Sequence, residues 1–578
     1  MIRVLPIEVA NKIAAGEVVE RPSSILKELM ENSLDANAKN IVVSIDGVNI
    51  RIDDDGVGMS RDDMILSVKR FATSKINTEK DLFAIATFGF RGEALPSIIS
   101  IAKVTMISRS VSDDIGTKIE FEGGKMLQIE DASRSVGTTV DVKNIFYNTP
   151  ARLKFLKGID TEYRYLLEVF EQVVLINNDV RFKLIRNGKV IYDLFPSSVK
   201  DRFLSILPKG AIDLVEINGA SEHIKLSGFV SSPKFARSSK DLEFIYVNKR
   251  IIFNNIVQKA IMEGYGLLLD KGKYPIYLIS LEIPNNEVDV NAHPRKMEVR
   301  FRNSNEVFNL VKYSINKVVS LNRLGDILPK KDLQNRTFVN EGDHDIKITK
   351  NVNRDFKFDI GGRPRKTSRM NNSPLVSNFL SDLNISPVSD IVVYQLFNKF
   401  LVTEKDDVLQ IIDQHAASEC VNYEKIKEQF ENKSVESQHF LLPYSINISK
   451  KNMVIIENNL SLFSSLGINI EVFGEDMINV ISVPIILKDS NVEDMIDDLI
   501  NKFSSSSSSS STEDKINIIL ATIACHASVR FGDEMNMFSA KQLISDLRKC
   551  KNPFTCPHGR PTTFEIPVKE LYKNFKRL

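Results

Sequence analysis

The sequence predicts a multidomain α/β protein, and three observations lead to that prediction. The chain has 578 residues, too many for a single hydrophobic core. Residues 1 to about 330 alternate short apolar strands, turns and amphipathic helices. A polar stretch from Lys330 to about Leu383 then interrupts this alternation, and strand-like segments resume at Ser389. We therefore expect an N-terminal α/β region, a flexible linker and a C-terminal α/β domain.

Composition limits the partners and the location that we expect for the protein. The chain is 43% hydrophobic, and 76 Lys and Arg balance 75 Asp and Glu, for a net charge of +1. Attraction to nucleic acid must therefore come from local basic patches. One candidate is the group Arg363, Arg365, Lys366 and Arg369, which could contact DNA phosphates transiently, but a solvated linker with no role in binding is the favoured explanation. No run of about 18 apolar residues and no N-terminal signal is present, so we expect no membrane contact and a cytoplasmic protein.

The first element is a helix that begins at Pro22-Ser23-Ser24. Its apolar stripe consists of Ile25, Leu26, Leu29 and Met30. Polar residues at i, i+4 and i+7 share the opposite face, and acid and amide side chains at this spacing can hold a metal and a water. They are Glu28, Asn32 and Asp35.

A strand at Ile41-Val42-Val43-Ser44-Ile45 follows, and then the turn Asp54-Asp55-Gly56-Val57-Gly58. The two glycines let the backbone approach a ligand closely, and Asp54 can accept a hydrogen bond from an exocyclic amine. Later glycine segments could offer N–H groups to phosphates. Alone, each piece is as well explained by a solvated face or a structural turn; in this order they predict an ATP site. The later segments are Thr73-Ser74-Lys75, Gly89 to Leu95 and Gly137-Thr138-Thr139.

The C-terminal region carries a second constellation. A strand is expected to end at Asp413, and the helix after it carries His415 and Glu419 one turn apart, a spacing suited to sharing a metal. All four cysteines lie in the last third of the chain, and Cys525 and Cys556 add thiolates. These ligands favour Zn²⁺, although Mn²⁺ could use the oxygens; ordinary core Cys and His are the alternative. The role of His526 stays open.

The serine run 504–511 predicts a disordered loop between helical segments.

Together, the segments resemble a known family. The stretch Glu28 to Ala36, the glycine turn, Gly89 to Leu95 and Gly137-Thr138-Thr139 resemble the ATPases shared by DNA gyrase B, heat-shock chaperones, histidine kinases and MutL. Ala14 to Pro22 and Phe146-Tyr147-Asn148-Thr149-Pro150-Ala151-Arg152 resemble MutL mismatch-repair proteins specifically.

This resemblance implies roles at the ATP site. Glu28 would be the general base, Asn32 would ligate Mg²⁺, and Asp54 would bind the adenine amine. Residues 71–96 would form a lid, and Lys296 would reach the γ-phosphate as a catalytic residue. The full set of implied nucleotide-binding residues is Asn32, Asp54, Gly56, Gly58, Thr73, Lys75, Gly89, Arg91, Gly92, Thr138, Thr139 and Lys296.

At the C-terminal site, the pattern from Asp413 to Glu424 resembles the endonuclease motif of MutL proteins that nick DNA, and Phe575-Lys576-Arg577 resembles its companion motif. Asp413 and Glu419 would then be catalytic, through two-metal chemistry. Gln438 to Pro443 resembles a sliding-clamp peptide, with a plain strand and turn as the alternative. The implied metal ligands are His415, Glu419, Cys525, Cys556 and His558.

The resemblance also implies an organisation and a function. An ATPase α/β sandwich would occupy residues 1–210, a second α/β (transducer) domain 211–330, a flexible linker 331–385 and an α/β dimerisation, metal-binding and endonuclease domain 386–578. The chain would be an ATP-switched homodimer that couples mismatch detection to nicking of the daughter strand. Its partners would be DNA, a mismatch-recognition protein and a sliding clamp, with nucleoid association during repair. The rival is a non-nucleolytic ATP-dependent matchmaker whose zinc is structural.

Overall fold

The computed structural model describes most of the chain. The described residues are 19–70, 72, 92–208, 212–270, 272–289, 299–327, 392–488, 490–505, 511–530 and 532–577. They form two compact units, one made of Met1–Asn322 with Glu419–Ser528 and the other of Arg323–Ser418 with Val529–Leu578. The division falls within one helix, between Ser418 and Glu419, so that this helix contributes to both units.

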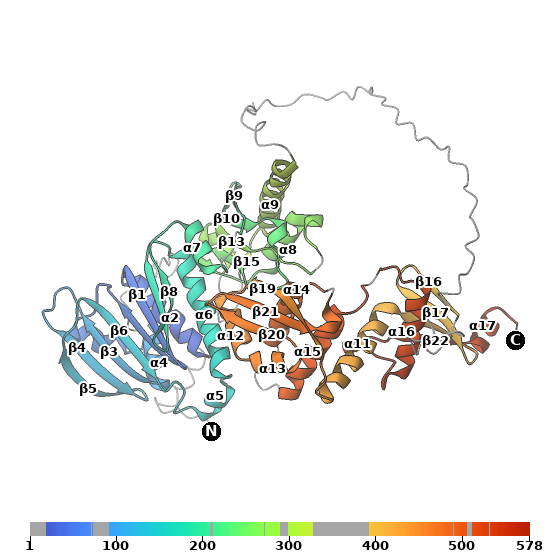
Figure 1. Ribbon diagram of the computed structural model, residues 1–578. Coiled ribbons are helices and arrows are strands. Elements are labelled where there is room, and N and C mark those ends of the chain that lie inside the picture. Colours follow the sequence, from blue (N-terminus) through green and yellow to red (C-terminus); the bar gives the residue numbers. More distant parts are fainter. Residues whose placement is uncertain are drawn as a thin grey trace, which may run out of the picture. The chain divides into compact units, whose positions relative to one another are not determined.

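The first unit contains an eight-stranded sheet in the order β5-β4-β3-β6-β2-β1-β7-β8 (Figure 1). Strands β1 and β7 are parallel, and the other neighbours are antiparallel. Most strands alternate buried with half-exposed residues, so that one face of the sheet packs against helices. The strands are β1 (Asn40–Asp46), β2 (Asn49–Asp54), β3 (Lys103–Arg109), β4 (Gly116–Glu122), β5 (Lys125–Ala132), β6 (Gly137–Lys143), β7 (Arg181–Arg186) and β8 (Lys189–Leu194).

Helix α2 (Pro22–Asp35) is central among the covering helices, because it packs against β2 and against two other helices. Proline at its first turn suits the helix start, and Arg21 just before it forms an ion pair of 2.9 Å with the buried Glu162. Its apolar stripe is buried as the sequence predicted, and Glu28 and Asn32 lie half-buried on the other face. The other helices here are α3 (Arg61–Ser67), α4 (Ala94–Ile101), α5 (Pro150–Phe155), α6 (Ile159–Ile176) and α7 (Val199–Ile206).

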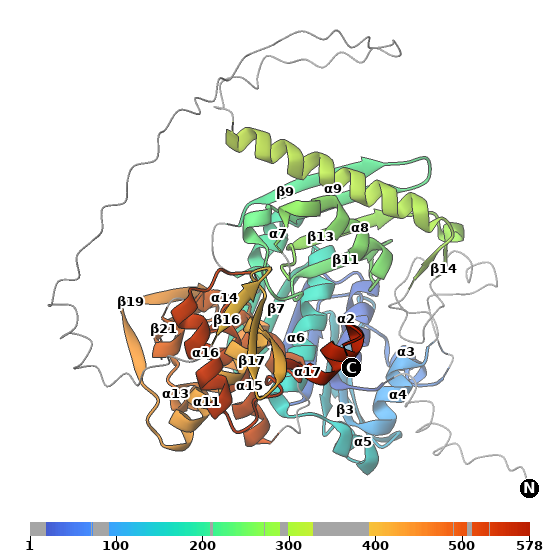
Figure 2. The same cartoon turned by 90° about the vertical axis from the view of Figure 1, so that its right-hand side faces the viewer.

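A five-stranded sheet follows in the order β12-β11-β13-β10-β9. Helix α9 (Ser304–Ile327) lies along β9, as Figure 2 shows, and the fit is close. A Cβ on Gly219 would lie 2.4 Å from Ser314 Oγ. The elements are β9 (Leu214–Ala220), β10 (Lys225–Ser231), β11 (Glu243–Val247), β12 (Arg250–Ile251), α8 (Asn255–Tyr265), β13 (Tyr277–Glu282) and the two-stranded β14 (Val288–Asp289) and β15 (Arg300–Phe301).

Residues 419–528 add a three-stranded sheet, β19-β21-β20, with its own apolar core. The register of β19 against β21 breaks between His439 and Tyr444. The elements are β19 (Ser437–Asn447), α12 (Lys450–Glu457), α13 (Leu460–Ser465), β20 (Asn469–Phe473), β21 (Met477–Pro484), α14 (Val492–Ser505) and α15 (Thr512–His526).

The second unit is a four-stranded antiparallel sheet, β16-β17-β18-β22, with helices. The strand-like segments predicted after Ser389 are confirmed, and the third of these strands ends at Asp413 as expected. The elements are β16 (Val393–Leu396), β17 (Phe400–Lys405), β18 (Val408–Asp413), α16 (Met537–Lys549), β22 (Thr563–Pro567) and α17 (Val568–Asn574), with the shared helix α11 (Gln414–Glu431).

The predicted fold class is therefore confirmed, with one local correction. Ser504 and Ser505 end α14, and the Ser511 side chain caps α15 by accepting from the Asp514 N–H, so the ends of the serine run are ordered. A serine hydroxyl is among the best helix N-caps, and composition alone hides this role. The predicted linker, with its basic group, lies outside the described residues. The domain boundaries stay a prediction. Among the described helices, none is long and apolar enough to cross a membrane.

Candidate nucleotide site and candidate metal centre

The carboxylate of Asp54 is held in place by hydrogen bonds at the candidate nucleotide site. Asp54 ends β2 and is 9% exposed. Its Oδ2 accepts a hydrogen bond from Ser33 Oγ at 2.8 Å, and its Oδ1 accepts from the N–H groups of Gly56 at 3.0 Å and Thr138 at 3.1 Å. Burial raises the pKa of Asp54, and these three hydrogen bonds partly offset that effect. The result is an oriented acceptor, as recognition of an exocyclic amine requires.

Two glycines allow close approaches of the backbone at this site. Gly58 has φ +68°, and a Cβ there would lie 1.9 Å from the carbonyl oxygen of Arg109. Gly137 has φ +126°, and its Cβ would lie 2.1 Å from the carbonyl oxygen of Asp54. Side chains are excluded at both positions on steric and conformational grounds. The predicted glycine turn is thus tied to β6 as well as to β2.

The two threonines after Gly137 take different roles. The N–H of Thr138 binds Asp54, and its hydroxyl lies 2.9 Å from Ser108 Oγ. The Thr139 hydroxyl donates to Asp53 at 2.6 Å, and Asp53 lies opposite Thr139 in the pairing of β2 with β6. Because neighbouring residues of a strand point to opposite faces, Thr138 is the one that shares the Asp54 face.

Arg134 and Glu31 are site residues that the motifs did not single out. Arg134 Nη2 donates to the Asp54 carbonyl oxygen at 2.8 Å, and Nη1 lies 3.7 Å from Asp53. It therefore holds the start of the glycine turn in place. Glu31 lies on α2 near Glu28, and burial raises its pKa to about 7. No spacing rule marks Arg134, because it lies between β5 and β6 and its partners come from β2.

Several predicted nucleotide-binding residues cannot be placed. Thr73, Lys75, Gly89, Arg91 and Lys296 lie outside the described residues, as does most of the predicted lid. Gly92 is described with φ +61°, and a Cβ there would lie 2.4 Å from the carbonyl oxygen of Ala72. The described part of this site therefore consists of the surroundings of Asp54 and the polar face of helix α2.

The candidate metal centre is built on α11, directly after β18. Asp413 Oδ1 accepts from the N–H groups of His415 at 2.9 Å and Ala416 at 3.0 Å, so Asp413 caps the helix with one oxygen. His415 Nδ1 lies 2.8 Å from the carbonyl oxygen of Val529. Since a carbonyl can only accept, Nδ1 carries the proton and Nε2 carries the lone pair that a metal would use.

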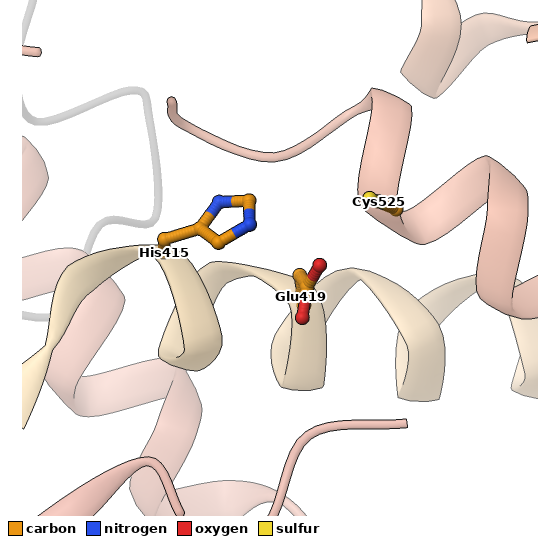
Figure 3. A group of neighbouring side chains, drawn as sticks. All are labelled: His415, Glu419 and Cys525. Atoms are coloured by element: carbon orange, nitrogen blue, oxygen red, sulfur yellow. The ribbon is translucent and has the colours of Figure 1, made fainter. Parts of the chain in front are cut away.

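Two candidate ligand groups meet on this helix. The ligand atoms of His415, Glu419 and Cys525 lie within 4.8 Å of one another, with the first two from α11 and the third from α15 (Figure 3). A second group combines Glu419 with Cys556 and His558. Glu419 is 2% exposed and belongs to both groups. One carboxylate shared by two nitrogen- and sulfur-containing sets fits two neighbouring cations of zinc-like preference.

The state of Cys525 shows why a cation matters here. Burial, with the Glu419 carboxylate beside it, raises the pKa of the Cys525 thiol to about 12. Protonated, the thiol is a neutral neighbour of the carboxylate. Ionised, the pair would repel unless a cation lay between them. His526, whose role the sequence left open, pairs instead with Asp498 at 2.8 Å.

Comparisons with known families fit these geometries. Residues 20–134 match the family described as histidine kinase-, DNA gyrase B-, and HSP90-like ATPase. Residues 208–320 match the C-terminal domain of DNA mismatch repair proteins, and residues 393–535 match the MutL C-terminal dimerisation domain. The chain is therefore an ATPase of this class, and the class implies ATP with a divalent cation at the N-terminal site.

Whole-length relatives narrow the class to one family. The DNA mismatch repair protein MutL of Clostridium tetani is 34% identical, covering 98% of this chain and 98% of that protein. The MutL of Caldanaerobacter subterraneus subsp. tengcongensis is 35% identical, covering 100% and 99%. The solved Aquifex aeolicus MutL ATPase domain with ADP is 28% identical over 51% of this chain and 98% of that one, with a TM-score of 0.37. The chain belongs to the MutL family of DNA mismatch repair proteins, and its dimerisation domain indicates a homodimer.

Proposed function

We propose that this protein is an ATP-switched MutL homodimer that couples mismatch detection to metal-dependent nicking of the daughter strand. The observation that carries the proposal is the sharing of Glu419 between two ligand groups, His415 with Cys525 and Cys556 with His558. Two cations held by one carboxylate can activate a water and stabilise a leaving oxygen in phosphodiester cleavage. Asp413, at the start of the same helix, supplies a further carboxylate.

At the ATP site, Glu28 would orient the attacking water and Asn32 would ligate Mg²⁺, both from the polar face of α2. Asp54 would bind the adenine amine, supported by Gly56, Gly58 and Thr138. These roles agree with the half-buried α2 face and the oriented Asp54 carboxylate. The phosphate contacts of Thr73, Lys75, Gly89, Arg91, Gly92, Thr139 and Lys296 remain part of the same proposal.

The second unit offers a surface for the homodimer. One residue from each strand forms an apolar row across the sheet, Tyr394–Val402–Ile411–Phe564. Tyr394 is 65% exposed and Phe564 is 64% exposed. Large apolar groups left exposed in a row on a sheet are typical of an interface. We assign this face to the second copy of the chain.

A sliding clamp would dock on β19. Leu441 is fully exposed and Leu442 nearly so, and both lie where the register between β19 and β21 breaks. The break takes residues 440–443 out of the strand pairing and leaves the Leu441 and Leu442 side chains available to a partner. This geometry supports Gln438 to Pro443 as a clamp peptide. A mismatch-recognition protein would be the upstream partner.

A second candidate function is an ATP-dependent matchmaker that does not cut DNA. The Cys and His donors around Glu419 favour this alternative, because such donors are typical of structural zinc. In that case the metal would hold α11 in place, and Asp413 would be only its cap.

Nicking of supercoiled circular DNA with Mn²⁺ separates the two functions, with Asp413→Asn as the test variant. The asparagine oxygen can still accept from the N–H groups of His415 and Ala416, so the helix cap persists while the charge is lost. We expect the wild type to nick and the variant to lose nicking by at least about 100-fold, with ATP hydrolysis unchanged. A wild type that hydrolyses ATP without nicking under these conditions would establish the matchmaker.

A further inference from the structure

A third group of metal-ligating side chains lies on α11 outside the two groups already described. It consists of Cys420, Glu424 and Cys550, whose ligand atoms all lie within 4.8 Å of one another. It shares no residue with the groups around Glu419. The family motif joins Glu424 to Asp413 and Glu419 in sequence, but the structure places its carboxylate beside two thiols.

The local structure explains how these residues meet. Cys420 and Glu424 are four residues apart on α11 and therefore share a face of the helix. Cys550 is the C-cap of α16, where its thiol donates to the Asp546 carbonyl oxygen at 3.5 Å. Cys420 is 3% exposed, and the other two are half-buried. The group is thus partly shielded from water.

The chemistry of this set points to a thiophilic cation. Around a tetrahedral zinc, two sulfur ligands at about 2.3 Å from the metal lie about 3.8 Å apart, so closing the group requires movements of only about 1 Å. Two thiolates and a carboxylate can lie together in a partly buried place only with a cation between them. Thiolate ligands select zinc over Mg²⁺ and Mn²⁺.

We propose that Cys420, Glu424 and Cys550 form a separate zinc site that joins α11 to the C-terminal end of α16. Neighbouring residues on a helix point about 100° apart, so Cys420 directs its ligand away from the face of Glu419. The four cysteines of the chain then divide into two pairs, Cys525 with Cys556 and Cys420 with Cys550. This zinc site does not require nuclease activity, because it would hold the helix that carries Glu419 whether or not the protein cuts DNA.

Cobalt spectroscopy of the full-length chain tests the site, with Co²⁺ as the probe. Thiolate–Co²⁺ charge-transfer absorption in the near ultraviolet scales with the number of thiolates bound. The variant with Cys525→Ser and Cys556→Ser should keep about half of the wild-type absorption, because two of the four thiols remain. The matched variant with Cys420→Ser and Cys550→Ser should keep the other half, and the variant lacking all four should have none.

Two results would overturn the site. One is loss of all thiolate–Co²⁺ absorption in the Cys525→Ser and Cys556→Ser variant while its circular dichroism and ATP hydrolysis match the wild type. The other is the finding that Cys420 and Cys550 form a disulfide in that variant and bind no Co²⁺ even after the disulfide is reduced. Should the Cys420→Ser and Cys550→Ser variant fail to fold, Glu424→Gln replaces it. That change keeps both thiols and should raise the Co²⁺ concentration needed for half-saturation by at least about tenfold; an unchanged concentration counts against the site.

Discussion

The nucleotide site and the metal centre are each built around a buried carboxylate, but the two carboxylates have different neighbours. Asp54 is surrounded by donors, namely the Ser33 hydroxyl and the N–H groups of Gly56 and Thr138. Glu419 is surrounded by candidate metal ligands, the imidazoles and thiols of its two groups. The chain's own donors therefore partly offset the cost of burying an ionised Asp54, whereas a cation must offset that cost for the ionised ligands around Glu419.

This difference separates the ways in which the two sites can fail. The site around Asp54 depends on backbone approaches at glycines, so changes in backbone sterics should damage it without any ligand present. The metal centre depends on side chains from several segments, so loss of the cation should damage it while the backbone is unchanged. A glycine substitution and the removal of a cation can be made independently, and we expect each to affect a different unfolding transition.

The largest effect is expected from Gly137→Ala. At φ +126° its Cβ would lie 2.1 Å from the Asp54 carbonyl oxygen, so β6 must move away from β2. We expect a loss of about 3 kcal/mol in unfolding free energy, with weakened ATP binding. Urea unfolding and nucleotide titration measure both.

Gly47→Ala is the matched control for that change. Gly47 has φ +61°, but nothing lies within 4 Å of the place that a Cβ would take, so only the conformational strain of about 1 kcal/mol applies. Equal losses of unfolding free energy in the two variants would mean that the close approach of Gly137 to Asp54 does not shape the site.

Metal removal should act on the other site. A cation present at about 100 times its dissociation constant contributes about 2.7 kcal/mol to the unit that binds it, and a chelator removes this contribution. We expect chelation to lower the thermal transition of the C-terminal region and to leave the transition that responds to ATP unchanged. Cys525→Ser should reduce the chelator effect. A chelator that lowers both transitions equally would contradict the separation of the sites.

The sequence was sufficient wherever the structural signal is local. Helix α2 and the strand β1 follow from apolar periodicity, and Asp413 stands at the strand-to-helix junction where the pattern placed it. In each case the residues that decide the structure lie within one or two turns of each other, so that spacing alone reports the shared face.

The sequence was insufficient where distant segments meet. Arg134 reaches Asp53 and Asp54 only because β2 pairs with β6, and Cys550 meets Cys420 only because α16 ends near α11. The cysteine count suggested one metal site, and nothing in the spacing shows that the thiols divide into two pairs. Packing across the whole domain decides which distant segments come into contact. The periodicity of a short stretch of sequence carries no information about such contacts.

A third buried carboxyl group, that of Glu171, should make the unfolding free energy depend on pH. Glu171 on α6 is 2% exposed and accepts a hydrogen bond from the Tyr192 hydroxyl at 2.9 Å. Burial raises its pKa from 4.5 to about 7. The raised pKa means that its stabilising effect is complete below pH 4.5 and is lost as the pH rises through about 7.

Glu171→Gln removes this titration. Relative to the wild type, the variant should gain about 2 kcal/mol of unfolding free energy between pH 5 and pH 8. Urea unfolding at both pH values measures the difference. Glu168→Gln, one turn away on the same helix, is the control and should show a much smaller change. A pH-independent difference for Glu171→Gln would show that folding does not raise the pKa of Glu171.

The smallest effect is expected from Ser33→Ala, which tests the donors around Asp54 one at a time. The change removes the 2.8 Å hydrogen bond to Asp54 Oδ2 and leaves those from Gly56 and Thr138 in place. Losing one bond to a carboxylate costs about 1 kcal/mol, which corresponds to nucleotide binding about fivefold weaker. Ser24→Ala, at a half-buried position on the same helix, should bind as the wild type does. Because a metal ligand would show its full loss in a single substitution, a graded response at Asp54 distinguishes a site held by several chain donors from one held by a cation.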